Sequence, residues 1–366
     1  MNSIRYFLII FSFISFPLIS FASGDKNPEK EFNVSEMIMH HVKDAHEWHL
    51  WGGELNGVSI YLPVILYDNE VKVFSSENFY HGEHIVAADH KTHQPISYLK
   101  GKGEATGYGM FHEKIYKLEK NQLNFEDGHV HGNIQPIDLS ITKNVTSLFI
   151  GAIIILILIL SMARFYKSNG AVAPKGIAKF IEPLVVVIRD DIAKENIGHG
   201  KHHKYVPYLL TIFFFIWFNN LLGLIPIFPG GANLTGNITI TFFLALCTLI
   251  LTLFSSNKNY WKHIFATPGV PVALMPIMIP IEIVGIFTKP FALTIRLFAN
   301  ITGGHIIILA LISIIFINKN IAWGALSVPM ALFISCLEML VAVLQAYLFA
   351  LLSALFIGAA VEEAHH

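Results

Sequence analysis

Two long apolar stretches constrain this chain more than any other feature. They cover residues 272–317 and 327–360 and hold few polar side chains. As one helix the first would be ~70 Å long at 1.5 Å per residue, more than twice the ~30 Å hydrocarbon core of a bilayer. It must therefore cross a membrane at a steep tilt, or break into two helices near Lys289-Pro290.

The composition agrees with a membrane protein. Of the 366 residues, 54% are hydrophobic and 14% are charged, against roughly 25% charged in a typical soluble domain. The formal net charge of -1 gives no sign of a nucleic-acid partner. Cys247 and Cys336 both fall in apolar segments, so we expect no disulfide and no redox chemistry, and no cofactor is predicted.

The chain divides into three regions. Residues 1–22 have Arg5, an apolar run and small residues at a cleavage position, which predicts a signal peptide. An uncleaved helix is the alternative, although the run is shorter than the ~20 residues of a membrane span. Residues 23–143 are predicted to form a periplasmic His-rich domain, and residues 144–366 the membrane domain.

The exported region is expected to be a small mixed α/β domain, with a helix at 35–51 and strands at 58–62 and 71–74. Eleven of the 18 histidines lie between His40 and His131. On the predicted helix, His46 and His49 have an i, i+3 spacing that could bind a metal. However, no His-Glu-x-x-His motif occurs, so no metal site is predicted; a role in assembly or in gathering protons at a channel mouth stays open.

Five membrane passes satisfy the charge distribution. Shorter spans are predicted at 145–163, 206–226 and 238–254. The loop at 164–204 holds eight Lys or Arg, which predicts a cytoplasmic side, a periplasmic N-terminus and a cytoplasmic C-terminus. Splitting the first long stretch into two spans would give a sixth pass and place the C-terminus on the periplasmic side. Within the first loop, apolar residues recur at helical spacing over 177–192, which fits an interfacial helix or an ordinary packing helix.

The few polar residues of the two long stretches point to transport. An arginine costs at least ~2.5 to 3.5 kcal/mol in a lipid-facing helix, so Arg296 indicates a function. Asn300 follows one helical turn later, and Glu338 aligns with Gln345 on the last stretch. A salt bridge between Arg296 and Glu338 that locks the bundle is the alternative. Transport fits better, because His305 and a carboxylate can exchange protons whereas arginine keeps its charge.

The chain resembles subunit a of the rotary, F-type ATP synthase of bacteria over about residues 140–364. The resemblance depends on four segments and on the Glu-Glu pair at 362–363: Asn-Asn-Leu-Leu-Gly-Leu-Ile-Pro at 219–226, Thr-Lys-Pro at 288–290, Arg-Leu-Phe-Ala-Asn at 296–300 and Leu-Gln-Ala-Tyr at 344–347. The resemblance implies a non-catalytic stator subunit in the cell inner membrane that couples proton flow to rotation. Its implied partners are the c ring, the b subunits of the peripheral stalk, the remaining subunits and membrane lipid.

The resemblance also implies roles for particular residues. Arg296 would face the ring carboxylates and block a leak between two offset half-channels. Residues of the periplasmic half-channel would be Asn300, His305, Glu338 and Gln345, and Glu282 would belong to the cytoplasmic one. Many bacterial members carry glutamate nine residues after the arginine and histidine on the last helix. This chain has the inverted arrangement.

The sequence leaves two other functions open. A secondary ion or solute transporter is the main alternative, although such proteins usually contain internal repeats and none is evident here. A haem-binding oxidoreductase subunit would need two histidines deep in apolar segments, and only His305 is so placed. ATP hydrolysis by the chain itself is not expected, since no Gly-x-x-x-x-Gly-Lys-[Ser/Thr] motif occurs.

Overall fold

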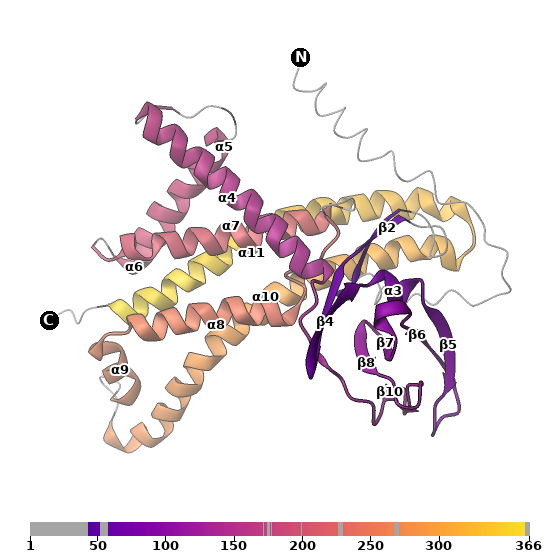
Figure 1. Ribbon diagram of the computed structural model, residues 1–366. Helices are drawn as coiled ribbons and strands as arrows, with labels where there is room; N and C mark the ends of the chain where they lie inside the picture. Colours follow the sequence, from indigo (N-terminus) through magenta and orange to yellow (C-terminus); the bar gives the residue numbers. More distant parts are fainter. Residues whose placement is uncertain are drawn as a thin grey trace, which may run out of the picture.

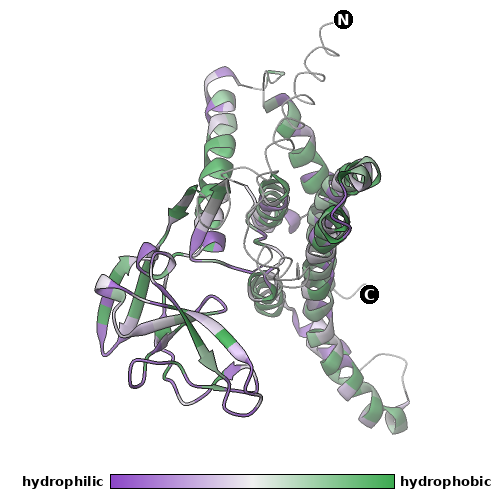
Figure 2. Cartoon of the chain, turned by 90° about the vertical axis from the view of Figure 1, so that its right-hand side faces the viewer, coloured by the Kyte–Doolittle hydropathy of each residue, from purple (hydrophilic) through white to green (hydrophobic). Residues whose placement is uncertain are grey.

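The computed structural model describes residues 43–51, 58–170, 172–173, 176, 178–198, 200–225, 230–266 and 271–362. The predicted signal peptide at 1–22, together with His40 and His41, lies outside these residues. The described chain consists of a small domain of β-sheets followed by a bundle of long helices (Figure 1). Figure 2 shows the contrast in hydropathy, with apolar residues along the helices and mixed residues in the β domain.

Over its described residues, the β domain has a short α-helix, a 3-10 turn at Gly103–Ala105 and four small antiparallel sheets. A four-stranded sheet has the order β5-β6-β7-β8 and a three-stranded sheet the order β11-β3-β4, while β1 pairs with β2 and β9 with β10. The bounds are β1 Glu47–Trp51, β2 Val58–Tyr61, β3 Pro63–Asp68, β4 Glu70–Ser75, α3 Glu77–Tyr80, β5 Glu83–Ala88, β6 Pro95–Lys100, β7 Tyr108–Phe111, β8 Lys114–Lys117, β9 Phe125–Glu126, β10 His129–Val130 and β11 Ile137–Asp138.

Alternation of side chains builds the core of this domain. In β3, Val64 and Leu66 are buried while Tyr67 is exposed, as expected for a strand with one covered face. The buried residues that share this core are Val64, Leu66, Phe74, Phe79, Ala105, Tyr108, Met110 and Ile115. A mixed domain was predicted, and the structure confirms it with strands as the main element.

The predicted helix at 35–51 is wrong over its described end. Residues Glu47–Trp51 form strand β1 instead, paired with β2. His46 immediately precedes this strand, so His46 and His49 do not share a helical face. Strand β3 was also missed, because the prediction passed from the strand at 58–62 directly to the one at 71–74.

Five helices are long and apolar enough to cross a membrane, among the residues that the structure describes. They agree with the five predicted passes. The turn between the last two helices contains Asn320, whose side chain accepts a hydrogen bond from the Ala322 amide at 2.9 Å. The bounds are α4 Lys143–Asn169, α7 Val206–Leu224, α8 Ile238–Ser255, α10 Met275–Ile317 and α11 Gly324–Val361.

Helix α10 is continuous over 43 residues. It passes through Pro280 and Pro290 without a break, so the alternative of two spans at this stretch is not found. Thr294 donates to the Pro290 carbonyl at 3.0 Å, a hydrogen bond from a side chain to the backbone one turn earlier in the same helix. At ~65 Å long, α10 can fit a ~30 Å hydrocarbon core only at a steep tilt.

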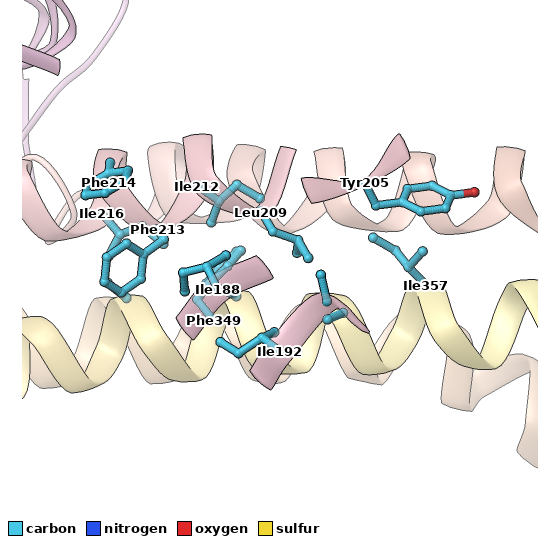
Figure 3. Close-up of a cluster of buried hydrophobic side chains, with 14 of the residues drawn as sticks. Ile188, Ile192, Tyr205, Leu209, Ile212, Phe213, Phe214, Ile216, Phe349 and Ile357 are labelled. Atoms are coloured by element: carbon cyan, nitrogen blue, oxygen red, sulfur yellow. The ribbon is translucent and has the colours of Figure 1, made fainter. Parts of the chain in front are cut away.

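Helix α7 is the centre of the bundle, and it packs on α4 and α11. The predicted amphipathic segment forms α5 (Ala178–Val186), a π-helical segment (Val187–Lys194) and α6 (Glu195–Ile197). Its apolar face packs inside the protein: Ile188 and Ile192 lie between α7 and α11, beside Leu209, Phe213 and Phe349 (Figure 3). Figure 1 shows α10 and α11 side by side as a hairpin whose turn projects beyond α7 and α8.

Candidate functional site

The candidate site is centred on His305 of α10 and Glu338 of α11. The Nε2 atom of His305 lies 3.8 Å from Oε1 of Glu338. Glu338 is buried and His305 half-buried. Within the described part of the chain, neither carboxylate oxygen of Glu338 nor Nε2 of His305 has a hydrogen-bond partner. The pair is thus close enough to exchange a proton through one bridging water.

A glycine makes room for this pair. A Cβ atom added to Gly304 would lie 2.6 Å from Oε1 of Glu338 and 2.7 Å from its carboxyl carbon. The carboxylate of α11 therefore occupies the space that a side chain of α10 would fill. At Gly303 a Cβ atom would meet nothing within 4 Å. Of these two adjacent glycines, only Gly304 lies where another helix approaches closely.

Buried amides of α7 extend the polar region. Asn219 donates to the Phe215 carbonyl at 2.7 Å, and Asn220 accepts from the Thr235 hydroxyl at 2.5 Å. Oδ1 of Asn219 and Nδ2 of Asn220 have no partner among the described residues. Sequence reasoning used these residues only as part of a family motif. Their signal was two adjacent amides inside an apolar span, where unpaired polar groups are costly.

The loop between α7 and α8 approaches His305. A Cβ atom on Gly223, near the end of α7, would lie 3.1 Å from the Ala232 carbonyl oxygen and 3.9 Å from Nε2 of His305. Thr302 of α10 donates to the Gly236 carbonyl at 3.4 Å. The loop is thus in contact with both α7 and α10 close to His305.

Arg296 and Asn300 lie elsewhere, on the exposed face of α10. Arg296 has neither a hydrogen bond nor an ion pair with any other described residue, so the alternative salt bridge with Glu338 is not found. An exposed arginine within an apolar helix needs a polar partner or water. In this protein such a partner must come from outside the described chain.

The other two predicted site residues are separated from the pair in different ways. Gln345 is buried on α11, two helical turns after Glu338 and on the same face. Glu282 is half-buried on the first part of α10, where α9 (Lys258–Phe265) packs, and it interacts electrostatically with Tyr260 of α9. The structure therefore brings His305 and Glu338 together. It places Gln345 two turns further along α11 and separates Glu282 from the pair.

A second cluster of titratable groups lies in the β domain around His46. The ring of His46 is buried, with Nδ1 3.5 Å from Glu113 and Nε2 3.4 Å from Asp138. Burial alone would lower the pKa of His46, but the two carboxylates outweigh it and raise that pKa to about 9. Tyr80 donates to Glu113 at 3.0 Å. Burial would raise the pKa of Glu113, yet its contacts with His46 and Tyr80 hold that pKa below the ordinary value.

Sequence reasoning missed Glu113 and Asp138 as partners of His46. Among the described residues, no group of three His, Cys, Asp or Glu side chains is arranged to hold a metal ion. The cluster instead forms an ion-paired network inside the domain. Lys143, at the start of α4, interacts electrostatically with Glu113 and Asp44 on one side and with His305 on the other.

Comparison with known proteins assigns most of the chain to known families. The model of a family described as ATP synthase A chain matches residues 145–358, and a model described as a domain of unknown function, DUF8433, matches residues 37–139.

Individual relatives agree with this match. The ATP synthase subunit a 2 of Chlorobaculum tepidum is 50% identical over 254 residues, which are 66% of this chain and 70% of the relative. The ATP synthase subunit a 2 of Prosthecochloris aestuarii is 43% identical over 319 residues, 84% of this chain and 93% of the relative. The ATP synthase subunit a of Myxococcus xanthus is 44% identical over 236 residues, 63% and 76% of the two chains.

Proposed function

The chain belongs to the ATP synthase A chain family, and we propose that it forms two offset proton half-channels against a rotating c ring. It is a component of the membrane sector, which is non-catalytic, and the proposal concerns how it moves protons. The observation that carries the proposal is the position of Arg296, an exposed cation on a membrane helix with no partner in the described chain.

In this proposal Arg296 faces the carboxylates of the c ring. A fixed guanidinium favours the ionised form of a carboxylate that passes it, so the proton leaves the ring there. The same charge repels a proton that would otherwise pass directly between the half-channels. Since arginine cannot be deprotonated in a protein, it cannot itself carry the leak.

The periplasmic half-channel is assigned to His305, Glu338, Gln345 and Asn300. His305 and Glu338 both exchange protons, and their 3.8 Å separation supports a relay. Gln345 continues the polar face of α11 toward the middle of the membrane domain, and Asn300 lies one turn from Arg296, where the relay would meet the ring. Glu282, on the separate first part of α10, is assigned to the cytoplasmic half-channel.

The orientation follows from the loops. Eight Lys or Arg residues in the segment 164–204 favour the cytoplasm. With five spans, the β domain is then periplasmic and the C-terminus cytoplasmic. We expect the c ring and the b subunits of the peripheral stalk as partners, because α10 and α11 present long apolar faces with exposed residues such as Phe291, Leu337 and Leu340.

The test is ATP-driven acidification of inverted membrane vesicles, with and without this chain and with and without sodium. We expect acidification to require the chain and to be independent of sodium, and the c ring to copurify with it. A secondary transporter would need no ATP hydrolysis by a partner complex and no c ring. Acidification that persists fully in the deletion strain would contradict the proposal.

A further inference from the structure

The β domain is attached to the membrane domain at two places. The first is the start of α4, where Asp44 accepts hydrogen bonds from the Thr142 hydroxyl at 2.8 Å and the Asn144 amide at 3.0 Å. The Lys143 amide also donates to the Ala45 carbonyl at 2.9 Å. These contacts fix the segment at 44–45 to the start of α4, the first membrane span.

The second attachment joins segments that are far apart in the sequence. The indole N–H of Trp48, in strand β1, donates to the Gly230 carbonyl at 3.1 Å. Trp48 is 3% exposed, so this bond is shielded from water. Gly230 belongs to the loop between α7 and α8, which lies close to His305.

Gly230 itself is closely packed. A Cβ atom there would clash with the carbonyl oxygens of Ile225 and Leu222 at the end of α7. Gly231 donates to the same Leu222 carbonyl at 3.2 Å. The loop is thus bound at adjacent residues by two elements: Trp48 of the β domain binds Gly230, and Leu222 of α7 binds Gly231.

The far side of the loop is fixed as well. Thr235 donates to Asn220, and the Gly236 carbonyl accepts from Thr302. Ala232 lies between these fixed points. A Cβ atom on Gly223 would lie 3.1 Å from the Ala232 carbonyl oxygen and 3.9 Å from Nε2 of His305, so the two groups are near neighbours. A shift of the loop at Gly230 would therefore change the surroundings of His305.

We propose that Trp48 is a positioning residue for proton entry: by holding Gly230, it fixes the loop at 230–237 beside His305. The inference rests on the proposed half-channel and gives the β domain a part in it. Trp48 does not itself exchange protons. Two titratable groups on other elements act on His305: Glu338 of α11, at 3.8 Å, and Lys143 of α4, through an electrostatic interaction. The first attachment fixes the backbone of Lys143.

The experiment uses the whole complex reconstituted in liposomes. Proton-driven ATP synthesis is measured per assembled complex while the pH on the periplasmic side is varied. Trp48→Phe keeps an aromatic ring and removes the indole donor, and Gly230→Ala pushes the same loop from the α7 side. Trp261→Phe is the matched control, because it removes an indole hydrogen bond of 2.9 Å, to Ser256, at the other end of α8.

We expect Trp48→Phe to lower the rate by about five-fold, the scale of one buried hydrogen bond. Gly230→Ala should lower it at least as much, because its Cβ would clash with two backbone carbonyl oxygens. Both variants should shift the periplasmic pH at half-maximal rate in the same direction. The control should keep the wild-type profile. An unchanged profile in both loop variants, or a loss confined to the amount of assembled complex, would overturn the inference. Glu338→Ala serves as the reference: normal synthesis by that variant would refute the proposed half-channel rather than the role of Trp48.

Discussion

His305 and Glu338 lie on different helices, 3.8 Å apart, and neither group has a hydrogen-bond partner at the facing atoms within the described chain. The resemblance to the family implies that the two residue types can be exchanged, so the pair offers a direct test of the relay. His305→Ala should slow proton flux and Glu338→Ala should slow it more, because Glu338 is the only acidic residue between Gly324 and Val361.

The double exchange, His305→Glu with Glu338→His, should recover more flux than either single exchange. ATP-driven acidification of inverted vesicles measures this, with the assembled complex quantified in parallel. A double variant no better than the worse single one would assign Glu338 a structural role instead.

Gly304→Ala should impair transport. Its Cβ would lie 2.6 Å from the Glu338 carboxylate, and displacing a reacting group by about 1 Å can cost about a hundred-fold. Gly303→Ala is the matched control, since its Cβ would meet nothing within 4 Å. Both substitutions raise helix propensity alike. Equal flux in the two variants would show that the position of Glu338 does not limit transport.

Arg296→Ala should abolish coupled transport while the complex still assembles, since this exposed side chain makes no contact that holds the described chain together. Arg296→Lys should also fail largely, because a compact ammonium does not reproduce a planar fork of five donors. Proton pumping and native electrophoresis of the complex measure the two effects separately. Full pumping by the alanine variant would refute the role of Arg296.

The C-terminus should lie in the cytoplasm. Alkaline phosphatase fused there should be inactive, whereas the same enzyme fused after Lys319, in the turn between α10 and α11, should be active. Activity at the C-terminus would refute the odd number of passes.

The His46 cluster should make the β domain sensitive to alkaline pH. The pKa of His46 is raised from 6.5 to about 9, so its stabilisation is complete below about pH 6.5 and is lost as pH rises through 9. The contribution is on the order of 3 kcal/mol. Hydrogen exchange of peptide 43–51 in the assembled complex, corrected for intrinsic rates, should rise across this window relative to peptide 83–100. His46→Gln should exchange faster at pH 7 and lose the pH dependence, and an unchanged dependence would exclude His46 as its source.

The membrane helices could be predicted closely from the sequence. The stretch predicted at 272–317 became α10 at Met275–Ile317, because a long apolar run leaves few alternatives to a helix in lipid. The continuity of α10 through Pro290 was harder to predict from the sequence, since proline normally ends helices in water. The resemblance implied that His305 and Glu338 belong to one half-channel, but no sequence pattern gave their contact, which the structure shows at 3.8 Å.

The β domain was less predictable because distant residues decide it. His46 is 67 residues from Glu113 and 92 residues from Asp138, and no local pattern links them. Glu113 also has a positive φ of 64° in the turn between β7 and β8, a place that glycine or asparagine normally marks. Helical spacing of histidines at 40–49 was a misleading signal, since pairing with β2 outweighs local preference there.

The bond between Trp48 and Gly230 spans 182 residues, and this separation orders the biogenesis of the protein. In the proposed orientation Trp48 is exported first, and Gly230 reaches the same side only after α4 and α7 have entered the membrane. The β domain can fold early, but it can bind the loop at 230–237 only after α7, the second of the five spans, has entered the membrane. The Trp48–Gly230 bond thus becomes a mark that α7 has been inserted, and a chain stopped after α4 would leave this surface of the domain open to other proteins of the periplasm.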